Sequence, residues 1–228
     1  VYLCFLPSGG VGNTVDASGK DYNSILGGYY NQLSGSSSSI VGGKYCEASG
    51  VGASVVGGSL TTADGDYAHA NGGYDNNAGG DMATVVGGIE GLVDGDGSTI
   101  GGGNGNIARG KYHTVAGGSL NSNIKGSAGS TGSVIRGGYK NAMRSSNYGM
   151  VGGGNQNNAF GPYSSIGGGY RNTIGSGYSS AILGGYRNTA YGDETFVGGG
   201  YFNTVGEIGT VVAGASIEAN ADYVSIGG

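Results

Sequence analysis

The chain has 228 residues, of which 56 are glycine and 2 are proline, with 11% charged residues and a formal net charge of −5 at pH 7. Glycine near one quarter without a three-residue period excludes collagen, and the negative charge argues against a nucleic-acid partner. No apolar run is long enough to span a bilayer, and two cysteines are too few for a disulfide framework.

The N-terminal segment, residues 1–24, does not follow the pattern of the remaining chain. It begins with the most apolar stretch, residues 1–6, and Pro7 stands before the first Gly-Gly pair. We expect an irregular coil or cap here, with a short insertion around residues 16–22.

From residue 25 an approximately 15-residue repeat continues to the C-terminus. Its marker is a residue, usually aliphatic and here called the anchor, two places before a Gly-Gly pair. The anchors are Ile25, Ile40, Val55, Ala70, Val85, Ile100, Val115, Ile135, Val151, Ile166, Ile182, Val197, Val212 and Ile226. Such a fixed period is typical of a solenoid, and both halves of the repeat alternate with the period of a half-buried strand.

The sequence therefore predicts an all-β chain, a parallel β-solenoid or β-roll with two short strands per coil of about 15 residues and about 15 coils. Residues 25–228 form a single repeat domain in this prediction. Five extra residues within 122–132 are expected to form an insertion loop. The last repeat is incomplete, so we expect the domain to be part of a longer repetitive chain.

A second inward column is predicted six places after the anchor, where asparagine recurs. Its members are Asn31, Asn76, Asn106, Asn121, Asn141, Asn157, Asn172, Asn188 and Asn203, and Cys46, Thr61, Gly91 and Glu218 occupy the same position in other repeats. Buried asparagine needs hydrogen-bond partners. Stacked copies one coil apart bond to each other and to the turns, so an asparagine ladder in the core is expected.

The outward residues beside the anchors define a face that we call the anchor face. Serine or threonine usually precedes the anchor, and an aliphatic residue or glycine follows it. An extended apolar strip usually marks an association surface. The predicted self-association residues are Leu26, Val41, Val56, Val86, Ala116 and Leu183. The opposite face carries charged and amide side chains and is predicted to be solvated.

Two surface columns are candidates for ligand contacts. Asp64, Asp66, Asp81, Asp94 and Asp96 recur near one turn and form either a weak Ca²⁺ candidate or a solvated acidic corner. No other metal and no cofactor is expected. Tyr139, Tyr170, Tyr186 and Tyr201 follow Gly-Gly pairs. Their rings either contact ligands such as surface glycans or cover the turns.

No arrangement of residues indicates an enzyme. His69 and His113 occupy different positions of the repeat, and neither has a metal-ligand neighbour at a suitable spacing. No serine, histidine and aspartate constellation can be proposed, and the glycine-rich segments lack the lysine of a phosphate-binding loop.

The alternation of Ser-x-Ile-x-Gly and Asn-x-Ala-x-Gly resembles the left-handed parallel β-roll of trimeric autotransporter adhesin heads, a resemblance that implies trimerisation through one apolar face. The Gly-Gly-x-x-Asn unit, as in residues 184–188, is also similar to repeats of phage tail fibres and other extracellular repeat proteins. The asparagine half-repeat resembles that of grass antifreeze β-rolls.

The first functional hypothesis is a structural and adhesive segment of a self-associating extracellular fibre or filament, on a cell or virion surface. Its main partner is then the chain itself, with a trimer as the leading assembly. The first alternative is an ice-binding solenoid that uses the anchor face, and the second is a glycan-binding phage tail-fibre segment. An ice-binding face needs a uniform column, which is interrupted here by His69, Val134, Arg136, Met150, Ala181 and Phe196.

Overall fold

The computed structural model describes residues 9–16, 22–124, 131–144, 146–221 and 223–227. The chain comprises two compact units, Val1–Tyr112 and His113–Gly228. We call them the first and the second unit and describe each by itself. The described residues form strands and turns, and among them no helix is long and apolar enough to cross a membrane.

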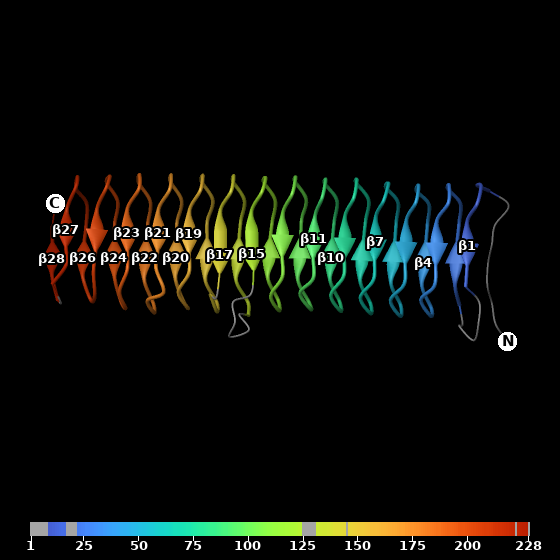
Figure 1. Ribbon diagram of the computed structural model, residues 1–228, viewed down its shortest axis with the longest axis horizontal. Coiled ribbons are helices and arrows are strands. Elements are labelled where there is room, and N and C mark those ends of the chain that lie inside the picture. The colour runs from blue at the N-terminus through green and yellow to red at the C-terminus, as the bar shows by residue number, and fades with distance from the viewer. Residues whose placement is uncertain (1–8, 17–21, 125–130, 145, 222, 228) are drawn as a thin grey trace. The chain divides into compact units, whose positions relative to one another are not determined.

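The first unit contains two parallel sheets, and each coil contributes one strand to each (Figure 1). One sheet has the order β1 (Thr14–Val15), β3 (Gln32–Leu33), β5 (Glu47–Ala48), β7 (Thr62–Ala63), β9 (Asn77–Ala78), β11 (Leu92–Val93) and β13 (Ile107–Ala108). The other has the order β2 (Ser24–Ile25), β4 (Ser39–Ile40), β6 (Ser54–Val55), β8 (His69–Ala70), β10 (Thr84–Val85) and β12 (Thr99–Ile100).

The second unit repeats this arrangement. One sheet has the order β15 (Ser122–Ile124), β17 (Ala142–Arg144), β19 (Asn158–Ala159), β21 (Thr173–Ile174), β23 (Thr189–Ala190), β25 (Thr204–Val205) and β27 (Glu218–Ala219). The other has the order β14 (Thr114–Val115), β16 (Val134–Ile135), β18 (Met150–Val151), β20 (Ser165–Ile166), β22 (Ala181–Ile182), β24 (Phe196–Val197), β26 (Thr210–Val211) and β28 (Ser225–Ile226). The predicted parallel β-solenoid with two strands per coil is confirmed, and 28 strands in the described residues agree closely with about 15 coils.

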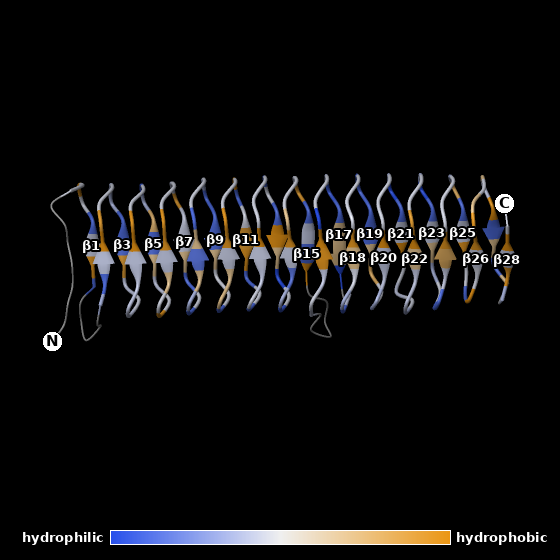
Figure 2. Cartoon of the chain, turned by 180° about the vertical axis from the view of Figure 1, so that it is seen from behind, coloured by the Kyte–Doolittle hydropathy of each residue, from blue (hydrophilic) through white to orange (hydrophobic). Residues whose placement is uncertain are grey.

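The core of each unit is a stack of anchors facing a stack of small residues. Ile166 pairs in register with Val151 and Ile182, and all three side chains are fully buried. Opposite them, Ala159 and Ile174 are buried as well. Burying one isoleucine or valine side chain contributes about 1.5–3 kcal/mol. Figure 2 shows hydrophobic segments in orange recurring along the chain between hydrophilic segments in blue.

The turns use left-handed backbone at residues other than glycine. Arg187 has φ 53° and Tyr163 has φ 56°, whereas the second glycine of the pair before Arg187, Gly185, has φ 96°. A left-handed residue with a side chain costs roughly 1–2 kcal/mol. The neighbouring coil offsets this cost, because the N–H of Arg187 donates to the carbonyl oxygen of Tyr170 at 2.8 Å.

The regular pattern reaches into the segment 1–24 that was predicted to be irregular. Strand β1 pairs in parallel with β3. The side chain of Asn13 donates to the carbonyl oxygen of Gly28 at 3.2 Å and accepts from the N–H of Asn31 at 3.0 Å, as an asparagine of the core column does. Residues 1–8 and 17–21, where the cap and the short insertion were expected, lie outside the described residues.

The predicted insertion loop within 122–132 begins later than expected. Ser122–Ile124 forms strand β15 and pairs with β17, so residues 122–124 belong to the solenoid. Residues 125–130 lie outside the described residues.

The anchor predicted at Val212 is wrong. Val211 is fully buried in β26, whereas Val212 is 50% exposed. In this repeat Ala213 stands where other repeats have the first glycine of the pair, so counting back from Gly-Gly chose the wrong valine. Ile217 consequently receives the core position predicted for Glu218, and its N–H donates to the side-chain oxygen of Asn203 at 3.1 Å. Glu218 is exposed.

Candidate interaction faces

The anchor face of the first unit is a flat surface of hydroxyl and aliphatic columns. The outward residues of its strands are Ser24, Ser39, Ser54, His69, Thr84 and Thr99, and the residues after the anchors are Leu26, Val41, Val56, Asn71, Val86 and Gly101. Parallel pairing of the strands aligns each column one residue per coil. Leu26, Val41, Val56 and Val86 are between 48% and 54% exposed, as predicted for a face without a partner in the chain.

Charge is segregated away from this face. None of its twelve positions carries a lysine, arginine, aspartate or glutamate. The charged residues of the described part of the first unit are Asp16, Lys44, Glu47, Asp64, Asp66, Asp75, Asp81, Glu90, Asp94, Asp96, Arg109 and Lys111, which lie at the turns and on the opposite sheet. Apolar surface without charge is what an association face requires.

The anchor face of the second unit is flatter. Leu183 is 60% exposed and Ala116 is also exposed, but Gly152, Gly167 and Gly198 occupy the same column. A Cβ atom on any of these glycines would collide with the carbonyl oxygen of the next coil, at Gly167, Leu183 and Val212 respectively. Arg136 is the one charged residue among the described positions after the anchors.

The asparagines form a continuous polar ladder within the core. Asn172 donates through its amide nitrogen to the carbonyl oxygens of Gly168 at 2.9 Å and Gly185 at 3.0 Å. Its amide oxygen accepts from the N–H of Asn188 at 3.0 Å. One side chain thus closes its own turn and links two coils. The structure places the predicted ladder residues Asn106, Asn121, Asn141, Asn157, Asn172, Asn188 and Asn203 in the core, each at most 1% exposed.

Other residues at the asparagine position do not make all of these hydrogen bonds. Cys46 is buried, and its N–H donates to the side-chain oxygen of Asn31 at 2.9 Å. The hydroxyl oxygen of Thr61 is buried with no hydrogen-bond partner among the described residues. An unsatisfied buried polar atom costs about 1–3 kcal/mol, so Thr61 is a weak point of the ladder.

In the predicted acidic corner, each carboxylate has its own hydrogen-bond or ion-pair partner. Asp64 accepts from the hydroxyl of Ser49 at 2.7 Å, Asp66 from the N–H of Val51 at 2.8 Å, and Asp81 from the N–H of Asp66 at 3.1 Å. In the described part of the chain, no group of three or more histidine, cysteine, aspartate or glutamate side chains converges to hold a metal ion.

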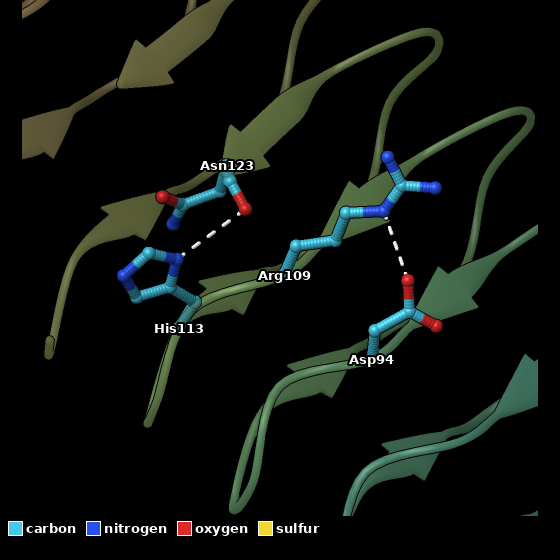
Figure 3. Close-up of polar contacts among 4 residues, drawn as sticks. All are labelled: Asp94, Arg109, His113 and Asn123. Atoms are coloured by element: carbon cyan, nitrogen blue, oxygen red, sulfur yellow. Dashed lines mark hydrogen bonds and ion pairs between the residues drawn. The ribbon is translucent and has the colours of Figure 1, made fainter. Parts of the chain in front are cut away.

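The remaining two aspartates each have a basic partner in the next coil. The Nε atom of Arg109 lies 2.9 Å from the carboxylate of Asp94 (Figure 3), and the Nζ atom of Lys111 lies 3.2 Å from that of Asp96. Both pairs are exposed, so each stabilises the fold by at most about 1 kcal/mol.

The tyrosines contact one another, glycines and cations. The rings of Tyr170 and Tyr186 stack with centroids 5.1 Å apart and an interplanar angle of 12°. On the opposite turn, a Cβ atom on Gly52 would meet the ring of Tyr67 at 2.8 Å, so that ring covers the glycine of the preceding coil. Of the four predicted ligand contacts, Tyr139, Tyr186 and Tyr201 are 40–52% exposed.

A column of cations lies beside these rings. From the sequence alone it was given no role and assigned to ordinary solvated surface. The Nζ atom of Lys140 lies 5.1 Å from the ring centroid of Tyr139, and the guanidinium carbon of Arg171 lies 5.0 Å from that of Tyr170. The signal in the sequence is the dipeptide of tyrosine and a basic residue directly after Gly-Gly, at 139–140, 170–171 and 186–187.

The histidines occupy unrelated places. His69 lies on the anchor face of the first unit, with its Nδ1 atom 2.6 Å from the hydroxyl oxygen of Ser54. No carboxylate hydrogen bond or ion pair to His69 occurs among the described residues. His113 is buried in the second unit, 3.3 Å from the carbonyl oxygen of Asn123 (Figure 3).

These features define a parallel β-solenoid repeat protein with an uncharged face of hydroxyl and aliphatic columns in the first unit and a cation column in the second. Comparison with known protein families finds no family model that matches this chain. Comparison with curated proteins finds no significant sequence match.

Proposed function

We propose that this protein is a structural segment of a self-associating extracellular fibre, in which copies pack through their anchor faces. The proposed setting is a cell or virion surface, and the expected assembly is a trimer or an open-ended filament. The proposal is supported most directly by the absence of charge from the twelve positions of the anchor face in the first unit.

The aliphatic column supplies the attraction. Four of its side chains in the first unit are about half exposed, and completing the burial of each contributes roughly 1 kcal/mol, half the value for a whole side chain. One contact is weak, but aliphatic residues occupy this column in four of the six coils of the first unit. Many weak contacts made together bind far more tightly than any of them alone.

The opposite sheet is a poor surface for the same contact. Its outward residues in the first unit include Glu47, Asp64 and Asp94, whose charges lose solvation when two copies approach. The charge distribution therefore favours one face over the other.

The experiment places one aspartate on each face of the same coil. Val41→Asp puts a charge into the aliphatic column, whereas Gln32→Asp puts the same charge at an exposed position of β3 on the opposite sheet. Sedimentation velocity is expected to show Val41→Asp as a monomer and Gln32→Asp assembled like the unmodified protein. Equal effects of the two substitutions on assembly would refute the choice of face.

Ice binding is the second candidate, and one observation favours it. Ser24, Ser39 and Ser54 are aligned by parallel pairing, beside an equally regular aliphatic column. The row is interrupted by His69 and Asn71 before it resumes at Thr84. A monomeric protein that shapes growing ice crystals, and loses this property in Ser39→Tyr, would favour ice binding over the fibre.

A further inference from the structure

The second unit carries a column of mainly basic side chains that belongs neither to the core nor to the anchor face. The left-handed position before the core asparagine is occupied in successive coils by Lys140, Gln156, Arg171 and Arg187, of which all but Gln156 are basic. The N–H of each left-handed residue bonds to a carbonyl oxygen of the preceding coil, as Arg171 does to Asn155 at 2.9 Å. The column therefore advances by one coil spacing, about 4.8 Å, per residue.

Aromatic rings hold the cations in place. The guanidinium carbon of Arg187 lies 5.4 Å from the ring centroid of Tyr186 and 5.5 Å from that of Phe202. Arg171 is placed over Tyr170 in the same way, and its Nε atom donates to the side-chain oxygen of Gln156 at 2.6 Å. A cation–π contact at an exposed site contributes about 0.5–1 kcal/mol. The aromatic rings therefore favour one placement of each cation.

The column lacks acidic partners. Among the described residues, the ion pairs are Arg109 with Asp94 and Lys111 with Asp96, both in the first unit. The formal charge of the second unit is also more positive than that of the first. Residues 1–112 contain four basic and ten acidic residues, a formal charge of −6, whereas residues 113–228 contain six and five, a formal charge of +1. The cations of the column are therefore available to an external anion.

A shallow polar hollow lies along the column. It has a volume of about 440 Å³ and is lined by Lys140, Gln156, Asn158, Arg171 and Thr173. Asn158 and Thr173 are outward residues of β19 and β21. The hollow thus combines two positive charges with amide and hydroxyl groups, which can both donate and accept hydrogen bonds.

We propose that this column binds an extended anionic polysaccharide that bears carboxylate or sulfate groups and lies along the stack of coils. The cations pair with the anionic groups, and Gln156, Asn158 and Thr173 bond to sugar hydroxyls. A linear chain of sugar rings suits a site that repeats at one coil spacing. The site lies on the other sheet and its adjoining turn, so it does not depend on association through the anchor face.

The rings argue against a nucleic acid as the occupant. Single strands bind by stacking bases on free aromatic faces. Here Tyr170 and Tyr186 cover each other, and guanidinium groups lie over them. The tyrosines therefore act as positioning residues for the cations, whereas the sequence left open whether their rings contact ligands or cover the turns.

The test is calorimetric titration of the full chain with polygalacturonate, dextran sulfate, uncharged dextran and oligothymidylate, at about 50 mM and about 300 mM NaCl. The double variant Arg171→Gln/Arg187→Gln removes two cations of the column. Its matched control, Arg109→Gln/Lys111→Gln, removes two cations that are paired with aspartates. The two double variants therefore have the same net charge.

We expect polygalacturonate, dextran sulfate or both to bind in a salt-dependent manner, and the two probes separate carboxylate from sulfate recognition. The column variant is expected to weaken this binding by at least about tenfold, and the control by less than about twofold. Arg171→Lys/Arg187→Lys keeps the charges and recovers most of the binding, whereas thermal melting shows that all variants are folded.

Three results would overturn the proposal. The first is binding of neither polyanion at about 50 mM NaCl, and the second is equal loss in the column variant and its control. The third is oligothymidylate binding more tightly than both polysaccharides, which would assign the column to a nucleic acid.

Discussion

Replacing Gly185 with alanine is expected to unfold the coil that contains it, whereas the same change at Gly184 is expected to be almost neutral. Gly185 has φ 96°, and a Cβ atom there would overlap the carbonyl oxygen of Gly200 in the next coil and lie 2.5 Å from the amide nitrogen of Asn188. At Gly184 no atom lies within 4 Å of the added Cβ. The two neighbouring glycines thus make a matched pair.

The magnitude follows from two costs. The left-handed backbone costs alanine roughly 1–2 kcal/mol. The displaced amide of Asn188 loses hydrogen bonds to the carbonyl oxygens of Gly184 and Gly200, both now 3.0 Å long, and buried groups left unpaired cost about 1–3 kcal/mol. Gly185→Ala should therefore lower the free energy of unfolding by about 2–5 kcal/mol.

The assay is urea unfolding followed by far-ultraviolet circular dichroism, with hydrogen exchange read on the peptide that covers residues 180–205. Hydrogen exchange is needed because coils in a repeat protein can open locally. Gly184→Ala is expected to stay within about 0.5 kcal/mol of the unmodified protein. Equal effects of the two substitutions would refute the account of the turn, and so would full protection of the peptide in Gly185→Ala.

Three further predictions concern single contacts, all measured by urea unfolding. Thr61→Asn should raise stability by about 1 kcal/mol, because the amide replaces an unpaired buried hydroxyl and extends the ladder; a loss of stability would count against the ladder. Asn172→Ala should lower it by about 2–4 kcal/mol, because Gly168, Gly185 and Asn188 each lose a bond; an effect below about 0.5 kcal/mol would contradict this. Arg109→Gln should cost less than about 1 kcal/mol, and less still in high salt, because its ion pair is exposed; a larger, salt-independent loss would show that the pair is structural.

The sequence predicted the strands and their register because the core depends on a simple spacing. An aliphatic anchor and an asparagine recur at fixed distances, and stacking aligns them automatically, as for Ile166 with Ile182 and Asn172 with Asn188. The error at Val212 shows the limit of that rule, since the marker was the Gly-Gly pair and Ala213 replaces its first glycine.

The left-handed turn residues and the contacts of the cations were not predicted, because they depend on particular contacts within and between coils that the repeat spacing does not specify. Arg187 and Tyr163 are left-handed because hydrogen bonds from another coil hold them there, and a local sequence rule assigns such backbone to glycine. The placement of Arg171 over Tyr170 depends on side-chain contacts within and between coils. Sequence reasoning therefore located the anchor face but treated the cation column as ordinary surface.

The mass of the purified particle, measured by light scattering over a range of concentrations, tests the proposed self-association most directly. The chain mass is 22.3 kDa. We predict a trimer or an open-ended polymer, which Val56→Asp or Val86→Asp reduces to single chains and Arg171→Asp leaves assembled. A particle that stays at the mass of one chain at every concentration would contradict the fibre proposal and favour the ice-binding alternative.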